Sequence, residues 1–232
     1  MSARYAIYYS PEADAPLTLA AANVLGRDAF GRAVEQRAPL PGLADLYLDL
    51  DELTADPRSY GFHATLKAPF ELAAGRSEDA LILAFEAFCK TAAPFTAPIQ
   101  VSNIGPFIAF RLATPSDEMG RLHSDCVRQF EPFRAPLSDD DIERRRRARL
   151  SPQQDARLLE FGYPYIFDDF QFHMTLTSSI KDDALRARLV AGLSDRLAAF
   201  QGPHRFETLA LFKQATRQDP FYVLHLARLN TP

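Results

Sequence analysis

Two stretches of this chain, 110 residues apart, share a tetrapeptide and the same predicted order of elements after it. The tetrapeptide H-x-T-L stands at residues 63–66 and again at residues 173–176. Each copy lies in a segment with the alternation of a β-strand, and an amphipathic helix and two further strands follow it. An internal repeat of this kind predicts a duplicated α+β fold with mostly antiparallel sheets.

The hydrophobic pattern and the Pro and Gly positions give a coarse map of the elements. Strands are predicted at residues 4–10, 61–68, 97–104, 107–112, 170–178, 205–212 and 221–229. Helices are predicted at residues 16–25, 77–91, 117–130, 139–149, 153–161 and 182–200. Residues 28–59 and 131–139 lack a sustained period and are predicted as irregular segments.

The repeat also predicts how the lobes are divided. We expect one bilobal domain over residues 1–232, with lobe 1 at about 1–112 and lobe 2 at about 113–232. Two pseudo-symmetric lobes, each with a mostly antiparallel sheet and outer helices, would then enclose a central groove.

Composition excludes several classes of protein. The 232 residues are 47% hydrophobic and 24% charged, which excludes a disordered chain. No stretch approaches the roughly 20 apolar residues that span a bilayer, and the first residues lack the apolar core of a signal peptide. The two cysteines, Cys89 and Cys126, form no metal-spaced pair. We therefore expect a cytoplasmic protein with no membrane partner.

The net charge is −4 and the pI is about 5.7, which argues against a broad nucleic-acid surface and against DNA as a partner. The one dense charge run begins with Asp139 and ends with Arg149. Acids at its start and arginines at its end complement a helix dipole. A solvated helix is the first interpretation of this run, and a phosphate- or RNA-contacting patch is the second.

Side chains alternate across a strand, so residues two apart share a face. In the first H-x-T-L segment the polar face would carry His63, Thr65 and Lys67. In the second segment the polar face would carry Gln171, His173, Thr175 and Thr177. The opposite faces are apolar and suited to packing. Each strand thus presents an imidazole beside a hydroxyl.

Two such faces across one groove suit the cleavage of a phosphodiester. A neutral histidine accepts a proton from the attacking water, and a protonated one donates to the leaving oxygen. The threonine hydroxyls donate to the non-bridging phosphate oxygens. A lone histidine on each strand is poor metal spacing, so neither a metal nor another cofactor is predicted.

Structural interpretations stand beside these functional ones. Both tetrapeptides could be half-buried strand histidines with a β-favouring threonine beside them. Lys67 is equally well explained as a solvated lysine, and Tyr8 as a packing residue rather than a groove residue. His123 is expected at a helix surface or boundary, and His225 in the core.

The motifs and the phrases around them resemble the two-histidine (2H) phosphoesterase superfamily. The resemblance covers nearly the whole chain, and wider stretches such as 60–70 and 161–177 are similar to its branch named for bacterial phosphonate metabolism. It implies a bilobal 2H phosphoesterase fold, with His63 and His173 as the general acid/base pair. It also implies that Thr65 and Thr175 bind the phosphate.

Three functions are compatible with this resemblance. The first is a metal-independent phosphodiesterase that hydrolyses a small cyclic phosphate, of a sugar or a nucleoside, in bacterial phosphonate catabolism. The second is RNA-end processing or a 2′–5′ RNA ligase-like activity, which needs a basic groove. The third is a non-catalytic module that binds a nucleotide or a sugar phosphate. The first predicts a small phosphodiester as the partner, and it makes Lys67, Tyr8, Gln171 and Thr177 further candidates for substrate contacts.

Overall fold

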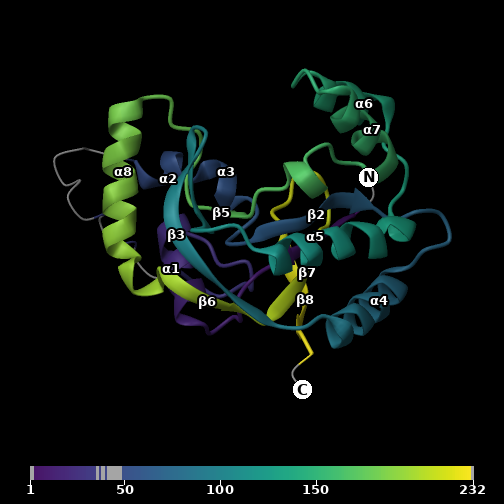
Figure 1. The fold of residues 1–232 in the computed structure, drawn as a ribbon, viewed down its shortest axis with the longest axis horizontal. Helices are drawn as coiled ribbons and strands as arrows, with labels where there is room; N and C mark the ends of the chain where they lie inside the picture. Colours follow the sequence, from purple (N-terminus) through teal and green to yellow (C-terminus); the bar gives the residue numbers. More distant parts are fainter. Residues whose placement is uncertain (1–2, 35–36, 38–39, 41–48, 231–232) are drawn as a thin grey trace.

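The computed structural model describes residues 3–34, 37, 40 and 49–230. In these ranges the strands form two four-stranded antiparallel sheets with helices around them (Figure 1). The strand order is β2-β1-β7-β8 in the first sheet and β5-β4-β3-β6 in the second. The predicted α+β class with antiparallel sheets is confirmed.

The first sheet joins the beginning of the chain to its end. Its strands are β1 (Arg4–Tyr9), β2 (Ala64–Glu71), β7 (Thr208–Gln214) and β8 (Tyr222–Arg228). Helix α4 (Glu78–Thr91) packs against β7 and β8, and α5 (Asp117–Gln129) packs against β2. The side chains of Ser77 and Ser116 cap these two helices by accepting backbone N–H groups of the first turn.

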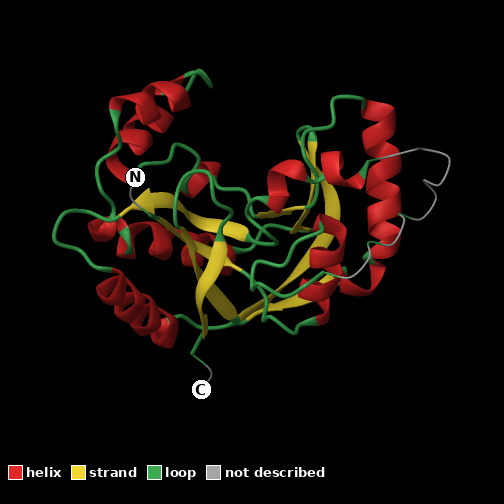
Figure 2. Cartoon of the chain, turned by 180° about the vertical axis from the view of Figure 1, so that it is seen from behind, coloured by secondary structure: helices red, strands yellow, loops and turns green. Residues whose placement is uncertain are grey.

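The second sheet comes from the middle of the chain. Its strands are β3 (Phe95–Ile104), β4 (Phe107–Leu112), β5 (His173–Thr175) and β6 (Gly202–Phe206). Helix α8 (Asp183–Arg196) packs against β3 and covers the outer side of this sheet. Figure 2 shows the two sheets and their flanking helices from behind.

The remaining helices lie in the connections. They are α1 (Pro16–Leu25), α2 (Leu50–Leu53), α3 (Ala55–Arg58), α6 (Asp139–Arg146), α7 (Pro152–Phe161) and three short 3-10 turns at Glu131–Phe133, Phe167–Asp169 and Ala198–Phe200. Helices α6 and α7 pack on each other and stand together at the top right of Figure 1. The described part of the predicted irregular stretch 28–59 holds α2 and α3, and the rest of that stretch lies outside the described residues. No described helix is long and apolar enough to cross a membrane.

The division predicted near residue 112 is wrong for the sheets, because each sheet takes strands from both sides of it. The predicted strand 205–212 is in fact two strands: β6 ends at Phe206 in one sheet, and β7 begins at Thr208 in the other. Period-2 alternation continues through such a crossing, so the local pattern does not reveal it. The predicted repeat order is kept, with three strands after α8 in place of two.

One apolar core joins the two sheets. Its buried members include Phe85 of α4, Phe110 of β4 and Leu211 of β7. A polar contact also crosses between the sheets, since Tyr9 of β1 and His204 of β6 share a hydrogen bond of 2.5 Å between Oη and Nε2. The sheets therefore form one packed body, which sets the relative position of β2 and β5.

Candidate active site

The two motif-bearing strands, β2 and β5, lie at the edges of their sheets and contact each other. Beside them opens a cavity of about 860 Å³. His63 and Thr65 line it from the β2 side, and His173 and Thr175 line it from β5. The tertiary fold thus brings both H-x-T-L motifs to one cavity.

His63 immediately precedes β2, and its ring is held by the backbone. Its Nδ1 lies 2.9 Å from the carbonyl oxygen of Gly61. A carbonyl only accepts, so this contact requires a proton on Nδ1 and leaves the lone pair on Nε2. The Thr65 hydroxyl lies 3.5 Å from that Nε2. His63 is therefore oriented with an unprotonated nitrogen beside a hydroxyl donor.

His173 repeats this arrangement on the other sheet. Its Nδ1 lies 2.6 Å from the carbonyl oxygen of Gln171, again two residues earlier in the chain. The same reasoning leaves its Nε2 available for proton transfer. The register of β5 against β4 places His173 opposite Arg111 and Thr175 opposite Ala109. The two histidines thus share one orienting contact and one tautomer.

Tyr8 of β1 forms the floor beneath the first histidine. Its ring stacks on the His63 ring with centroids 4.0 Å apart and planes 25° apart. Burial raises the pKa of the Tyr8 phenol well above its usual value, so the hydroxyl stays protonated. Tyr8 both packs and lines the cavity, which joins the two interpretations offered by the sequence.

Both histidines are shifted toward the neutral form. The pKa of His63 is lowered to about 4, chiefly by burial; the hydrogen bond to the Gly61 carbonyl opposes this shift, and the charge of His173 contributes to it. Burial also lowers the pKa of His173, and the nearby Arg111 acts in the same direction. Because a charge on His173 disfavours a second one on His63, the pair holds a single proton more readily than two.

Lys67 does not lie in the cavity, contrary to the predicted polar face. A β-bulge in β2 causes this: Tyr8 pairs with Thr65, but Ile7 pairs with Lys67, so one extra residue interrupts the alternation. Lys67 therefore shares the face of the core residue Ile7. Its side chain is 3% exposed, and Nζ donates to Glu131 at 2.8 Å and to the carbonyl of Val127 at 3.0 Å.

The other two predicted contact residues, Gln171 and Thr177, make hydrogen bonds within the protein. The side chain of Gln171 is exposed and accepts from Arg111 at 3.4 Å, outside the main cavity, while its carbonyl orients His173. Thr177 does line the cavity, but its hydroxyl accepts the N–H of Ile108 at 3.1 Å. The period-2 pattern could not distinguish these uses, because strand β5 ends at Thr175.

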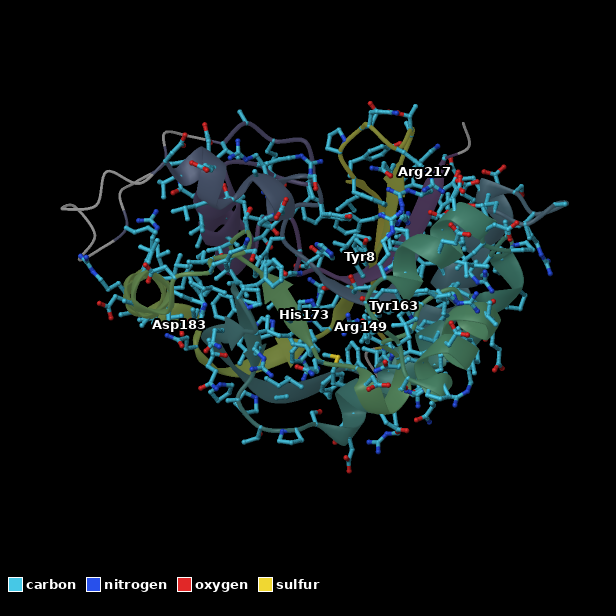
Figure 3. All side chains as sticks on the ribbon, turned by 90° about the horizontal axis from the view of Figure 1, so that it is seen from above. Tyr8, Arg149, Tyr163, His173, Asp183 and Arg217 are labelled. Atoms are coloured by element: carbon cyan, nitrogen blue, oxygen red, sulfur yellow. The ribbon has the colours of Figure 1, made fainter. Side chains whose placement is uncertain are left out.

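Sequence reasoning missed several aromatic and basic residues of the cavity. Tyr60, Tyr163, Tyr165 and Arg145 also line it. Seen from above in Figure 3, Tyr8, Tyr163 and His173 lie close together in the middle of the molecule. Tyr60 lies close to the first motif, and Arg145 lies in the charge run. Their positions in the sequence do not indicate which way their side chains point.

His123 is a correction to the sequence analysis. It was expected at a surface or boundary, yet it is 2% exposed and stacks on Phe170 at 3.8 Å between centroids. Its Nε2 accepts the N–H of Phe167 at 3.2 Å, and burial lowers its pKa to about 4. His225, expected in the core, is half-buried and lies 3.1 Å from a Glu86 oxygen. Neither lines the main cavity.

Carboxylate and thiol groups are sparse around the motifs. Within the described ranges, no group of three or more His, Cys, Asp or Glu side chains is arranged to hold a metal ion. The carboxylate that lines the cavity in those ranges is Asp56.

Comparison with known proteins gives the family. Residues 65–222 match the family described as "Protein of unknown function (DUF1045)", which is more than half of the chain. The chain belongs to this family. This DUF1045 protein brings two H-x-T-L motifs from two antiparallel sheets to one cavity, an arrangement that resembles the 2H phosphoesterase superfamily.

Two relatives of this DUF1045 protein carry the same name. "Ribose 1,5-bisphosphate phosphokinase PhnN" of Janthinobacterium sp. (strain Marseille) is 40% identical over 178 residues, which are 76% of this chain and 39% of that protein. The protein of that name in Laribacter hongkongensis (strain HLHK9) is 28% identical over 97% of this chain and 52% of its own length. The chain therefore spans about half, or less, of the curated relatives that it matches.

Among solved structures, E. coli LigT complexed with 3′-AMP aligns over 100% of both chains with 11% identity and a TM-score of 0.49.

Proposed function

We propose that this DUF1045 protein is a phosphodiesterase that opens a small cyclic phosphate, with His63 as general base and His173 as general acid. One observation carries the proposal: each Nδ1 is held by the carbonyl two residues earlier, so both Nε2 atoms are available at one cavity. Paired, oriented nitrogens of this kind are what acid/base catalysis needs.

In the proposed reaction, His63 accepts one proton and His173 donates another. Water attacks phosphorus while the Nε2 of neutral His63 takes its proton, and the bond to the leaving oxygen breaks as His173 Nε2–H donates to that oxygen. The lowered pKa of His63 keeps it neutral near pH 7, and the charge of His173 adds to this effect. The anionic substrate would favour the protonated form of His173. The hydroxyls of Thr65 and Thr175 would donate to the non-bridging oxygens.

The substrate class is proposed from the cavity and the relatives. Its walls carry aromatic and hydroxyl groups suited to a sugar ring, and its volume suits a small molecule. The relatives are named for ribose 1,5-bisphosphate, which supports a phosphorylated sugar as the substrate. The resemblance of the motif phrases to the branch named for phosphonate metabolism supports a role in phosphonate catabolism. We also propose a cytoplasmic location, since both cysteines are free and buried.

The test is a screen of ribose and nucleoside cyclic phosphates followed by phosphorus NMR, with a metal chelator present. We expect one cyclic phosphate signal to give a monoester signal. His63→Ala and His173→Ala should each lower kcat by roughly two to four orders of magnitude, because each removes one proton transfer. His225→Ala is the matched control, since His225 lies outside the cavity.

Three outcomes would contradict the proposal. Undiminished turnover in either active-site histidine variant excludes the acid/base pair. Activity that disappears with the chelator and returns with a metal ion excludes the metal-independent mechanism. Tight binding of a sugar phosphate or nucleotide with no product from any cyclic phosphate indicates a non-catalytic module instead.

A further inference from the structure

A second hollow adjoins the catalytic cavity. Its volume is about 480 Å³, and its walls include Arg4 of β1 with Arg144 and Arg145 of α6. Tyr60, Pro69, Tyr165 and Arg145 line both the hollow and the catalytic cavity, so the two spaces share a wall. We call Arg4, Arg144 and Arg145 the arginine shelf. Arg4 stands 140 residues before Arg144 in the chain, and only the fold brings it to Arg144 and Arg145.

The positive charges of the arginine shelf are incompletely neutralised. Arg4 donates to the amide oxygen of Gln214 at 2.7 Å, and Arg145 lies over the Tyr163 ring at 4.7 Å. Within the described residues, neither makes an ion pair with a carboxylate. Arg144 pairs with Asp141 at 2.7 Å, but the same carboxylate also pairs with Arg217 at 2.9 Å.

The surroundings of Arg4 reflect this excess. Its pKa is lowered from the ordinary value, first by burial and then by the positive charges of Arg217 and Arg144. A guanidinium keeps its proton in proteins, so the repulsion between these positive charges persists until an anion binds among them. Guanidinium groups bind phosphate oxygens in paired hydrogen bonds, and several of them around one hollow are typical of a phosphate site.

From this geometry we infer that the arginine shelf binds a second phosphate group of the substrate, distant from the one that is cleaved. The inference rests on the proposed function and narrows it to a cyclic phosphodiester whose sugar also carries a phosphate monoester. The site is built from side chains of β1 and α6, whereas the proposed chemistry takes place at β2 and β5.

An aromatic wall joins the two sites. Tyr60 belongs to the shared wall, and its ring centroid lies 5.6 Å from that of His63. Tyr60 is itself held by stacking on Phe221 at 5.2 Å with planes 13° apart. A molecule with one phosphate beside His63 and another on the shelf therefore passes along a fixed aromatic wall. A sugar packs well on such a surface.

The test compares uridine 2′,3′-cyclic phosphate with the same compound carrying a 5′-phosphate. We expect the 5′-phosphorylated compound to have at least a tenfold higher kcat/KM in the wild-type protein. Arg4→Gln and Arg144→Gln should each remove most of this advantage and change hydrolysis of the unphosphorylated compound less than about threefold. Arg144 is 53% exposed, so its replacement should not disturb folding. Arg147→Gln on the same segment is the matched control, because Arg147 does not line the hollow.

A binding measurement separates this inference from the proposed function. Ribose 5-phosphate carries the remote phosphate and no diester, and calorimetry should show that it binds the wild-type protein and binds the Arg144→Gln variant at least fivefold more weakly. If it does so while no cyclic phosphate is hydrolysed, the shelf stands and the proposed function fails. If both uridine compounds are hydrolysed equally and the arginine variants change neither, the proposed function stands and the shelf is refuted.

Discussion

Each of the two motif histidines is oriented by one hydrogen bond to a backbone carbonyl. Gly61 and Gln171 offer their carbonyl oxygens to Nδ1, which fixes the tautomer and leaves Nε2 available for the proposed proton transfer. In both motifs the histidine stands at the start of a strand, immediately before β2 for His63 and as the first residue of β5 for His173, and the residue two before it lies outside the strand. At this scale the site consists of two similarly oriented imidazoles in unequal surroundings, with Tyr8 stacked on the ring of His63.

The threonine hydroxyls can be tested by an isosteric change. We expect Thr65→Val and Thr175→Val each to lower kcat/KM about 10²- to 10³-fold, because each removes a donor to the developing charge on phosphate oxygens. Steady-state kinetics on the substrate found in the screen would measure this. Thr177→Val is the comparison, since that hydroxyl accepts the Ile108 N–H and its loss should cost about 1 kcal/mol of stability. An unchanged kcat/KM for Thr175→Val would show that its hydroxyl does not contact the phosphate.

At the scale of the element, the approach to β2 decides where His63 points. Gly61 has φ +80°, in the left-handed region that favours glycine. A Cβ at this position would lie 2.6 Å from the Cβ of Ala29, which is too close for any side chain. The chain therefore needs glycine here to place the carbonyl that holds His63. Further along the same strand, the β-bulge between Thr65 and Lys67 turns Lys67 into the core, where it pairs with Glu131.

Gly61→Ala should therefore damage stability and activity together. We expect a loss of about 2 to 3 kcal/mol in the free energy of unfolding, from backbone strain and the clash with Ala29, measured by urea denaturation. We also expect at least a tenfold lower kcat, since the orienting carbonyl moves.

Gly75→Ala is the control for this prediction. Gly75 has a similar φ of +78°, but a Cβ there would meet nothing within 4 Å. Its replacement should cost about 1 kcal/mol and leave kcat unchanged. Equal losses of activity in the two variants would show that strain, rather than the position of the Gly61 carbonyl, is responsible.

At the scale of the whole molecule, the fold holds histidines neutral in its interior. His123 and His63 both have a pKa lowered to about 4, in each case chiefly by burial. In the unfolded chain a histidine titrates near 6.5. Between about pH 6.5 and pH 4 the unfolded chain therefore binds more protons than the folded one. The contribution of these two histidines to the free energy of unfolding is therefore fully present above pH 6.5 and declines as the pH falls toward 4.

This linkage predicts a specific effect of His123→Gln. The wild-type protein should lose stability from pH 7.5 to pH 4, and His123 should account for about 3 kcal/mol of that loss, because each pKa unit corresponds to about 1.4 kcal/mol. The variant should be less stable at pH 7.5 but show a flatter dependence on pH in urea denaturation. The same slope in His123→Gln and wild type would refute the assignment.

The sequence by itself determined the features whose physics is local. Helix α1 spans Pro16–Leu25 as predicted, and β4 spans Phe107–Leu112, because apolar periodicity, proline and glycine act within a few residues. The two H-x-T-L motifs likewise identified the four residues that the fold brings to one cavity. A pair of residues at i and i+2 in a strand, such as His63 and Thr65, can be recognised from the sequence without a structure.

Tertiary structure alone decided what depends on strand partners. The bulge that turns Lys67 away from the cavity is set by how β2 pairs with β1. The chain crosses from one sheet to the other at Glu207, because β6 and β7 pair with strands of different sheets. The convergence of Arg4 with Arg144 and Arg145 has the same origin. Such contacts join segments far apart in the chain, and the alternation of side chains does not encode which strand a neighbour will be.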